Sequence, residues 1–288
     1  MKHRFLILTA CLLSLCMLAS CRPAGPVQST EPATKPATDS AELTLPATEE
    51  LPTKPTEDES EEVPMESITT YQNPILTAET DQAWPGYGFG DPFVMRYNGM
   101  YYLYCSTKDG SVGIKCWSSP DLVNWTYEGF CTSEKLTRGA YAPEVYYYNG
   151  YFYMYTSPAG NGHYVLRSTS PTKGFQVVTP NMGMSIDGSV FVDNDGTWHF
   201  YSAGFGAMQV YDMAKPTQMR NGRSIPAISV NGAWTEGGMV VYHDGYYYMT
   251  YTGNHVLSRA YRINYGVSAT SPLKFADIPV QNPLLIHT

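Results

Sequence analysis

A pattern of about fifty residues occurs four times between Asp91 and Tyr251, and this repeat constrains the fold more than any other feature. Each copy is a strand-like run, an Asn-Gly or Asp-Gly pair, and a second run rich in aromatic residues. The pairs are Asn98-Gly99, Asn149-Gly150, Asp195-Gly196 and Asp244-Gly245. These pairs favour type I′ turns, because both central residues of such a turn need a positive φ. The sequence therefore predicts four β-hairpins in series.

A third run follows each hairpin and ends at a corner that contains proline. The four corner prolines are Pro120, Pro171, Pro216 and Pro272. A hairpin with two further strands, repeated about every fifty residues, is typical of a β-propeller blade. The composition agrees, since 24 Tyr and 25 Gly among 288 residues indicate an all-β chain. We predict an all-β propeller with about four blades; a β-sandwich with chance hairpins is the alternative.

The N-terminus has the features of an export signal. Lys2 and Arg4 precede an apolar run that is too short for a comfortable membrane span. The run ends at Leu18-Ala19-Ser20-Cys21, which resembles a bacterial lipobox. We expect residues 1–20 to be a lipoprotein signal peptide and Cys21 to carry the lipid. The protein is then held at the extracellular face of the cell membrane. An ordinary signal peptide with an incidental cysteine is the alternative.

The next segment, residues 21–66, is rich in Thr, Pro and Glu and has few large apolar side chains. Such a segment cannot bury enough surface to fold, so we predict a disordered tether. It holds 11 acidic and 3 basic residues, a net charge of −8 that equals the charge of the full chain. The domain at residues 67–288 is therefore nearly neutral, which argues against a nucleic-acid partner.

Three cysteines fall in the predicted domain. Cys105 and Cys116 lie on either side of a Lys-Asp-Gly turn. They could form a disulfide in an exported protein, or both could be buried thiols. Cys131 has no partner under either interpretation.

Three carboxylates lie near the starts of three predicted first strands. Asp91, Asp187 and Glu236 are 7, 8 and 8 positions before their turns. The first strands of propeller blades line a central channel, so these acids are expected to share one pocket. Crowded acids have divergent pKa values, which gives the acid and base that glycoside hydrolysis needs. Alternatively, the carboxylates accept hydrogen bonds from backbone N–H groups, or together hold Ca²⁺.

Four further residues near these acids are candidates for substrate binding. They are Trp84, Tyr141, Glu144 and Trp234. Flat aromatic faces suit sugar rings, although aromatic residues in such a chain also pack between blades. Glu144 is 5 positions before Asn149, closer to its turn than the other acids are to theirs.

As an ordered set, several motifs resemble glycoside hydrolase family 43, whose members are five-bladed β-propellers that include arabinofuranosidases, β-xylosidases and arabinanases. The matching segments are Asn73-Pro74-Ile75-Leu76, Gly90-Asp91-Pro92, Trp117 to Trp125, Arg138 to Glu144, Ile186 to Ser189 and Thr235 to Gly238. The sequence departs from the family at Tyr141, usually Trp, and at Gly188, often Pro. The chain ends about where a fifth blade, which supplies a His near a central cation, is expected to begin.

The resemblance implies that Asp91 is the general base and Glu236 the general acid, with Asp187 raising the pKa of that acid. It implies an inverting enzyme that releases arabinofuranosyl or xylosyl units from plant cell-wall polysaccharide or oligosaccharide. The chemistry needs no cofactor or metal, and structural Ca²⁺ could lie in the central channel. A non-catalytic, surface-tethered carbohydrate-binding propeller is the main alternative, and a retaining hydrolase of levan or inulin is a further one.

Overall fold

The structure is a computed structural model, and it describes residues 70–72, 90–106, 113–225, 234–254, 258–277 and 282–286. Every described residue belongs to the second of two units, Thr48–Thr288. The predicted signal peptide, the lipid site at Cys21 and the tether at residues 21–66 lie outside the described residues and stay predictions. No helix in the described part of the chain is long and apolar enough to cross a membrane.

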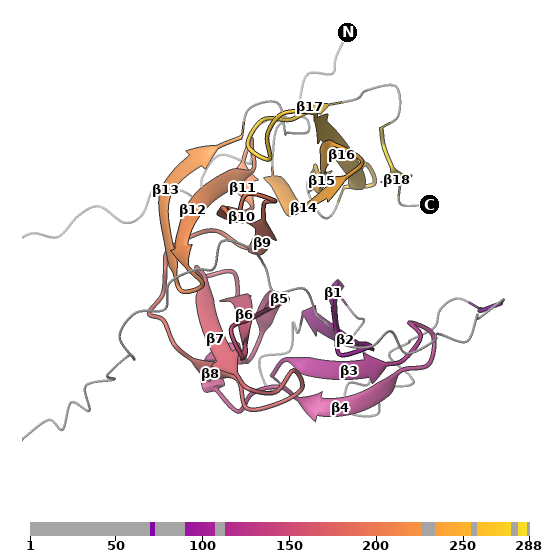
Figure 1. The fold of residues 1–288 in the computed structure, drawn as a ribbon, viewed down its shortest axis with the longest axis vertical. Helices are drawn as coiled ribbons and strands as arrows, with labels where there is room; N and C mark the ends of the chain where they lie inside the picture. Colours follow the sequence, from indigo (N-terminus) through magenta and orange to yellow (C-terminus); the bar gives the residue numbers. More distant parts are fainter. Residues whose placement is uncertain are drawn as a thin grey trace, which may run out of the picture. The chain divides into compact units, whose positions relative to one another are not determined.

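The second unit contains four antiparallel sheets, which we call blades 1 to 4, and each corresponds to one sequence repeat (Figure 1). Blade 1 consists of β1 (Gly90–Tyr97), β2 (Met100–Ser106), β3 (Lys115–Ser119) and β4 (Thr126–Phe130). Blade 2 consists of β5 (Ala140–Tyr148), β6 (Tyr151–Pro158), β7 (Tyr164–Ser168) and β8 (Gln176–Val177). Blade 3 consists of β9 (Ser189–Val192), β10 (Trp198–Ser202), β12 (Gln209–Lys215) and β13 (Gln218–Ser224). Blade 4 consists of β14 (Trp234–His243), β15 (Tyr246–Gly253), β16 (Arg262–Ser268) and β17 (Ala276–Asp277).

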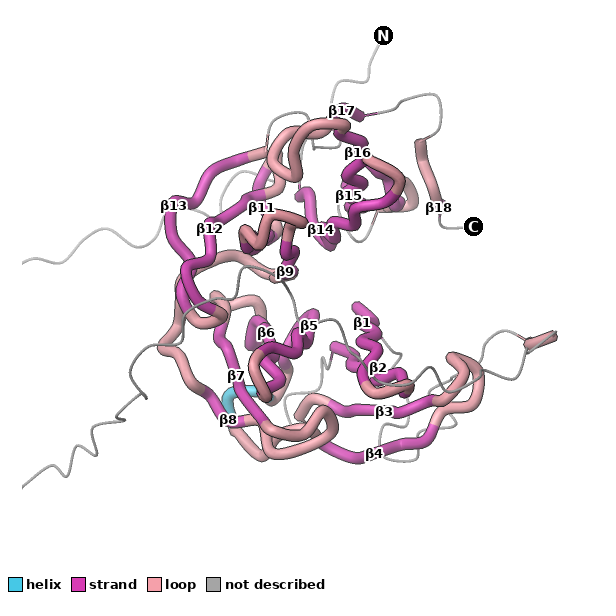
Figure 2. Tube along the Cα trace, in the orientation of Figure 1, coloured by secondary structure: helices cyan, strands magenta, loops and turns pink. Residues whose placement is uncertain are grey.

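Blade 4 has two short additional strands. β11 (Gly204–Phe205) pairs with the start of β14, and β18 (Leu285–Ile286) pairs with the start of β16. The only helix among the described residues is the 3₁₀ turn η1 (Lys135–Thr137), shown in cyan in Figure 2. The predicted all-β architecture is therefore confirmed.

The first strand of each blade lies innermost. Figure 1 shows β1, β5, β9 and β14 facing a common centre, while β4, β8 and β13 lie on the outside. Consecutive inner strands also contact one another, from β1 to β5, β5 to β9 and β9 to β14. This is a propeller arrangement, and it brings the starts of the inner strands together as the repeat predicted.

Apolar side chains fill the spaces between consecutive blades. One buried cluster, which includes Tyr104 and Met154, joins blades 1 and 2. A second, which includes Tyr155 and Phe200, joins blades 2 and 3, and a third joins blades 3 and 4 around Tyr251. Burial of these large rings is the main stabilising term, since apolar surface removed from water contributes about 25 cal/mol per Å².

Three of the four predicted hairpin turns have the expected geometry. Both central residues have positive φ in Asn98-Gly99 (50° and 72°), Asn149-Gly150 (48° and 82°) and Asp244-Gly245 (47° and 84°). The prediction is wrong for Asp195-Gly196, where only Gly196 has positive φ. There the connection between β9 and β10 covers residues 193–197, and the Asp193 N–H donates to the Thr197 carbonyl. Asp195 and Gly196 thus belong to a longer turn.

The three cysteines of the domain are free and buried. Cys116 lies opposite Tyr104, so Cys105 is one position out of register with it. Because neighbouring residues of a strand point to opposite faces, the two sulfur atoms lie on different sides of the sheet. Cys105 packs with Leu103 and Trp117, whereas Cys116 belongs to the cluster between blades 1 and 2. The disulfide is not formed, and the interpretation as buried thiols is confirmed.

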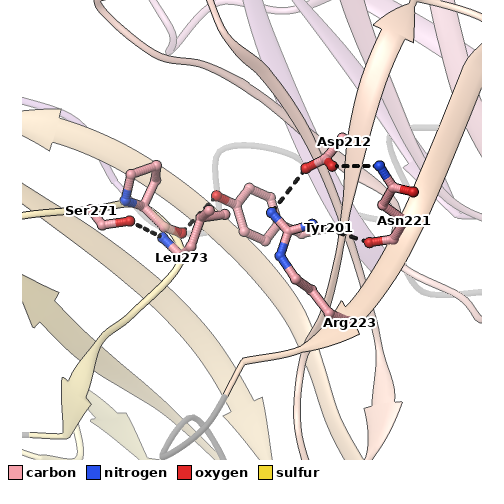
Figure 3. Close-up of polar contacts among 7 residues, drawn as sticks. Tyr201, Asp212, Asn221, Arg223, Ser271 and Leu273 are labelled. Carbon is pink, nitrogen blue, oxygen red and sulfur yellow. Dashed lines mark hydrogen bonds and ion pairs between the residues drawn. The ribbon is translucent and has the colours of Figure 1, made fainter.

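A tyrosine in each of the first three blades is hydrogen-bonded to the proline corner of the following blade. The hydroxyls of Tyr104, Tyr155 and Tyr201 donate to the carbonyls of Pro171, Pro216 and Pro272 at 2.6, 2.9 and 2.9 Å. Figure 3 shows the Tyr201 hydroxyl pointing at the corner that carries Ser271 and Leu273. We call this repeated contact the tyrosine–proline bond.

We expect Tyr155→Phe to lower the free energy of unfolding by about 1 to 3 kcal/mol, because it leaves a buried carbonyl without its donor. Tyr155 is fully buried and the bond spans blades 2 and 3. Urea denaturation would measure the loss. The control is Tyr246→Phe, which removes a hydroxyl from a tyrosine that is 45% exposed and should change stability by less than about 0.5 kcal/mol. Equal effects of the two changes would contradict this role.

Candidate active site

Three of the four inner strands begin with the same local irregularity. The pairing skips residues between Gly90 and Phe93 in blade 1, Tyr141 and Glu144 in blade 2, and Glu236 and Met239 in blade 4. Such β-bulges bend a strand and redirect a side chain, and they are common beside active sites.

One residue with positive φ lies inside each irregularity. Asp91 (46°), Ala142 (43°) and Gly237 (62°) take this place in blades 1, 2 and 4. Asp187 (59°) takes it in blade 3, directly after Ile186, whose carbonyl accepts the Ala203 N–H at 2.8 Å. Non-glycine residues rarely adopt this conformation, so its occurrence at Asp91 and Asp187 makes these two carboxylates candidates for a functional role.

This register corrects the predicted equivalence of the three acids. Asp91 and Asp187 occupy the same place in their blades, but Glu236 is one residue earlier, at the place of Gly90. Counting from the turns gave Asp187 and Glu236 the same spacing because the third turn is longer than the others. Glu236 therefore occupies the first position of its bulge, whereas Asp91 occupies the second position and Asp187 the equivalent place in blade 3.

The starts of the inner strands enclose a cavity of about 570 Å³. Asp91, Glu144 and Asp187 line it, together with the backbone of Gly237 and Gly238. Apolar and aromatic side chains supply much of the remaining wall. These include Phe93, Met239, Tyr261, Ile263 and Leu285. A concave, largely apolar site with a few convergent carboxyl groups is the kind of pocket that binds and transforms small molecules.

The Asp91 carboxylate is fixed by a serine from the neighbouring strand. The buried hydroxyl of Ser106 donates to Asp91 Oδ2, and the Ala142 N–H donates to Ser106 Oγ at 2.7 Å. Ser106 thus links the bulge of blade 1 to the bulge of blade 2. One oxygen of Asp91 is held in place, and the residue still lines the cavity.

Asp187 is bonded to the strand that carries Glu236 and feels the charges of both other acids. Its Oδ2 accepts the Gly237 N–H at 2.9 Å, directly beside Glu236. Burial, reinforced by the negative charges of Asp91 and Glu236, raises the pKa of Asp187 to about 7, and the Gly237 bond opposes this rise. Asp187 therefore changes protonation near neutral pH under the influence of both other acids.

Glu236 is held by a tyrosine that lies 25 residues later in the chain. The Tyr261 hydroxyl lies 2.8 Å from Glu236 Oε1 and 3.1 Å from Thr252 Oγ1. The Thr252 hydroxyl in turn donates to the Glu236 carbonyl at 3.0 Å. Burial raises the pKa of Tyr261, so its hydroxyl stays protonated over the range in which carboxyl groups titrate.

Glu144 lies on β5, where the pairing resumes after the bulge, and is buried. Its Oε1 accepts the Val190 N–H of blade 3 at 2.6 Å. Burial raises its pKa to about 7 against the effect of this bond. Glu144 thus joins blades 2 and 3 at the cavity wall, and its role in substrate binding stays a prediction.

The family model of the glycosyl hydrolases family 43 matches residues 71–287 of the chain. The chain belongs to this family. An extracellular endo-α-(1→5)-L-arabinanase of Bacillus subtilis is 24% identical over 216 residues, 65% of this chain and 67% of the relative. An arabinoxylan arabinofuranohydrolase of the same organism is 30% identical over 44% of this chain and 33% of the relative. The chain thus spans about two thirds of the arabinanase and about one third of the arabinofuranohydrolase.

Among solved structures, a Bacteroides thetaiotaomicron protein described as an endo-1,4-β-xylanase has a TM-score of 0.61 and 32% identity. The similarity covers 68% of this chain and 74% of that one. The family resemblance and the propeller class predicted from the motifs are therefore confirmed, and the relatives are enzymes that hydrolyse glycosyl bonds.

The family 43 chain has a steric reason to carry glycine rather than proline after Asp187. A Cβ on Gly188 would lie 2.3 Å from Phe200 Cζ and 2.6 Å from His163 Nε2. The His163 ring packs edge-on against Phe200 with centroids 5.3 Å apart, and His163 is buried. These two rings occupy the space behind the third acid, which explains this departure from the family pattern.

The three aromatic residues predicted to bind substrate are Trp84, Trp234 and Tyr141, and the structure describes them only in part. Trp84 lies outside the described residues. Trp234 begins β14 opposite Phe205, and nothing is described of its side chain. Tyr141 lies at the bulge of blade 2, and its ring is next to Gly160, 3.7 Å from where a Cβ would be. Their roles in substrate binding stay predictions.

Within the described ranges, no group of three or more His, Cys, Asp or Glu side chains is arranged to hold a metal ion. Structural Ca²⁺ in the central channel therefore stays a prediction.

Sequence reasoning missed the three hydroxyl residues that hold the acids, Ser106, Thr252 and Tyr261. The sequence held a signal for two of them, Ser106 and Thr252. Ser106, Ser157 and Thr252 occupy the same place, opposite the first residue of the bulge, in blades 1, 2 and 4. A recurring hydroxyl residue two positions after the aligned Tyr104, Tyr155 and Thr250 could have been noticed in the repeat. No comparable pattern points to Tyr261.

Proposed function

We propose that this protein is an inverting glycoside hydrolase that releases arabinofuranosyl or xylosyl units from plant cell-wall polysaccharide or oligosaccharide. The observation that carries the proposal is the electrostatic coupling of three carboxyl groups, of which Asp91 and Asp187 line one cavity and Glu236 lies beside its Gly237 wall. The charges of both Asp91 and Glu236 act on the half-buried Asp187. Family membership supports the reaction class, and relatives named for arabinan and arabinoxylan support the sugars.

In the proposed reaction Asp91 is the general base and Glu236 the general acid. Asp91 takes a proton from water as the water oxygen bonds to the anomeric carbon. The bond from that carbon to the leaving oxygen breaks on the opposite face, and Glu236 gives its proton to this oxygen. One water is consumed and the anomeric configuration inverts. Solvent then removes the proton from Asp91 and returns one to Glu236.

Asp187 is the proposed modulator of the general acid. It reaches the first residue after Glu236 through the Gly237 N–H, and the two carboxyl groups influence each other electrostatically. A negative charge at this place favours retention of the proton on its neighbour. Glu144, Trp84, Tyr141 and Trp234 are proposed to contact the substrate.

We also propose that the enzyme acts at the cell surface, anchored through lipid on Cys21. A tether at residues 21–66 would hold the propeller away from the membrane, where it can reach polysaccharide. The basic, apolar and lipobox segments at residues 2–21 support this placement.

The test is an assay of the protein with aryl α-L-arabinofuranosides and β-xylosides, and with arabinan and xylan. The expected result is release of the sugar, and NMR of the first product should show the inverted anomer. Binding of the polysaccharide without any release would contradict catalysis and favour a carbohydrate-binding protein. A first product of retained configuration would contradict the assignment of Asp91 as base.

A further inference from the structure

The side chain that holds the proposed general acid has a hydroxyl with one proton and two acceptors. Tyr261 Oη lies 2.8 Å from Glu236 Oε1 and 3.1 Å from Thr252 Oγ1. Thr252 uses its own proton in a 3.0 Å bond to the Glu236 carbonyl, so its oxygen is available as an acceptor. The Tyr261 proton can therefore be donated to either oxygen.

The balance between these acceptors depends on the charge of Glu236. A carboxylate oxygen is a stronger acceptor than a neutral carboxyl or hydroxyl oxygen, and charge-assisted bonds are roughly twice as strong as neutral ones. When Glu236 gives up its proton, Oε1 gains negative charge and attracts the tyrosine proton. Tyr261 also lines the cavity and is partly buried, so bulk water does not screen this bond fully.

We propose that Tyr261 is a positioning residue for proton donation by Glu236, an inference that rests on the proposed function. Its hydroxyl holds Oε1, which leaves Oε2 as the oxygen that gives up the proton, and it donates a bond that strengthens as Glu236 becomes a carboxylate. Only interactions that are stronger in the transition state than in the ground state accelerate a reaction. Tyr261 therefore contributes most when proton donation is most advanced.

The test compares two leaving groups in the wild-type protein and in Tyr261→Phe, which removes only the hydroxyl. A disaccharide has an alcohol leaving group that must be protonated, whereas a dinitrophenyl glycoside of the same sugar releases a stable phenolate. We expect kcat for the disaccharide to fall by about 10- to 100-fold, and kcat for the dinitrophenyl glycoside by less than about threefold. KM for both should change little.

A double-variant cycle separates this role from a purely structural one. In a Glu236→Gln background no proton is donated, so adding Tyr261→Phe should cause no further loss with the disaccharide. Tyr246→Phe on the surface of β15 is the matched control and should behave as the wild type. Thermal unfolding of each variant shows whether it is folded.

The outcomes distinguish the two proposals. If the wild-type protein hydrolyses neither substrate, the proposed function fails. If the wild type is active and Tyr261→Phe slows both substrates equally, or slows neither, the function stands and the role of Tyr261 is wrong. A further loss in the Glu236→Gln background would also overturn it, because Tyr261 would then act independently of the acid.

Discussion

Glu236→Gln is expected to slow hydrolysis of a disaccharide by about 10²- to 10⁴-fold and hydrolysis of a dinitrophenyl glycoside far less. The physical reason is that an alkoxide is a poor leaving group without a proton, whereas dinitrophenolate leaves without one. Glutamine keeps the acceptor for the Tyr261 hydroxyl, so the local structure is preserved. Steady-state rates on the two substrates measure the difference.

Asp91→Asn is expected to give the opposite pattern. Activation of water is required whatever group leaves, so both substrates should be slowed by a similar factor of about 10² or more. The matched control is Asp244→Asn, because Asp244 is in an exposed turn where two other blades carry Asn-Gly. The assignment of Glu236 as acid would be contradicted if Glu236→Gln slowed both substrates equally. The assignment of Asp91 as base would be contradicted if Asp91→Asn slowed only the disaccharide.

The second large effect concerns stability and pH. The pKa of Asp187 is raised from its ordinary value near 3.8 to about 7, first by burial and then by Asp91 and Glu236. A raised pKa means that the folded state prefers the protonated carboxyl. Its contribution to stability is complete below about pH 4 and is lost as pH rises through 7.

Asp187→Asn is therefore expected to stabilise the protein at pH 8, by on the order of 3 kcal/mol, and to change stability little at pH 4.5. Asparagine cannot ionise, its side-chain oxygen can accept the Gly237 N–H, and it tolerates the φ of 59° at this position. Urea denaturation at the two pH values measures the difference. A variant that is less stable than the wild type at pH 8 would contradict the prediction.

The same variant should lose most of its hydrolytic activity, since no charge at residue 187 can then act on Glu236. Gain of stability with loss of activity is the usual relation for a strained catalytic group. Glu144 adds a pH dependence of the same sign, because burial also raises its pKa to about 7. The double variant Asp187→Asn/Glu144→Gln should thus have the flattest stability between pH 4.5 and 8.

Much of this fold follows from short-range signals. The Asn-Gly and Asp-Gly pairs indicate the hairpins, and the spacing of the repeats indicates the blades. Asp195-Gly196 shows the limit of such counting, because residues 193–197 form a longer turn that shifts the register by one position. This shift of one position made Glu236 seem equivalent to Asp187, although Glu236 lies one position earlier in its blade than Asp187 does in its own.

The candidate site was less predictable than the fold. The three acids could be found because each lies near the start of a repeat, whereas the partners that orient them depend on distant contacts. Tyr261 reaches Glu236 from beyond β15, and Ser106 reaches Asp91 from the end of β2. The free thiols of Cys105 and Cys116 illustrate the same limit, since one position of register decides whether two sulfur atoms face each other.

The tyrosine–proline bonds have a consequence for the way the chain folds during synthesis. Each donor belongs to one blade and its acceptor to the next along the chain, with 61 to 71 residues between them. A nascent blade therefore keeps a hydroxyl unpaired until its successor has emerged and docked. Coupling between nearest neighbours means that each blade is more stable when its successor is folded and docked. A substitution that unfolds a late blade would then lower the stability of the blade before it, and through that blade the stability of the one before.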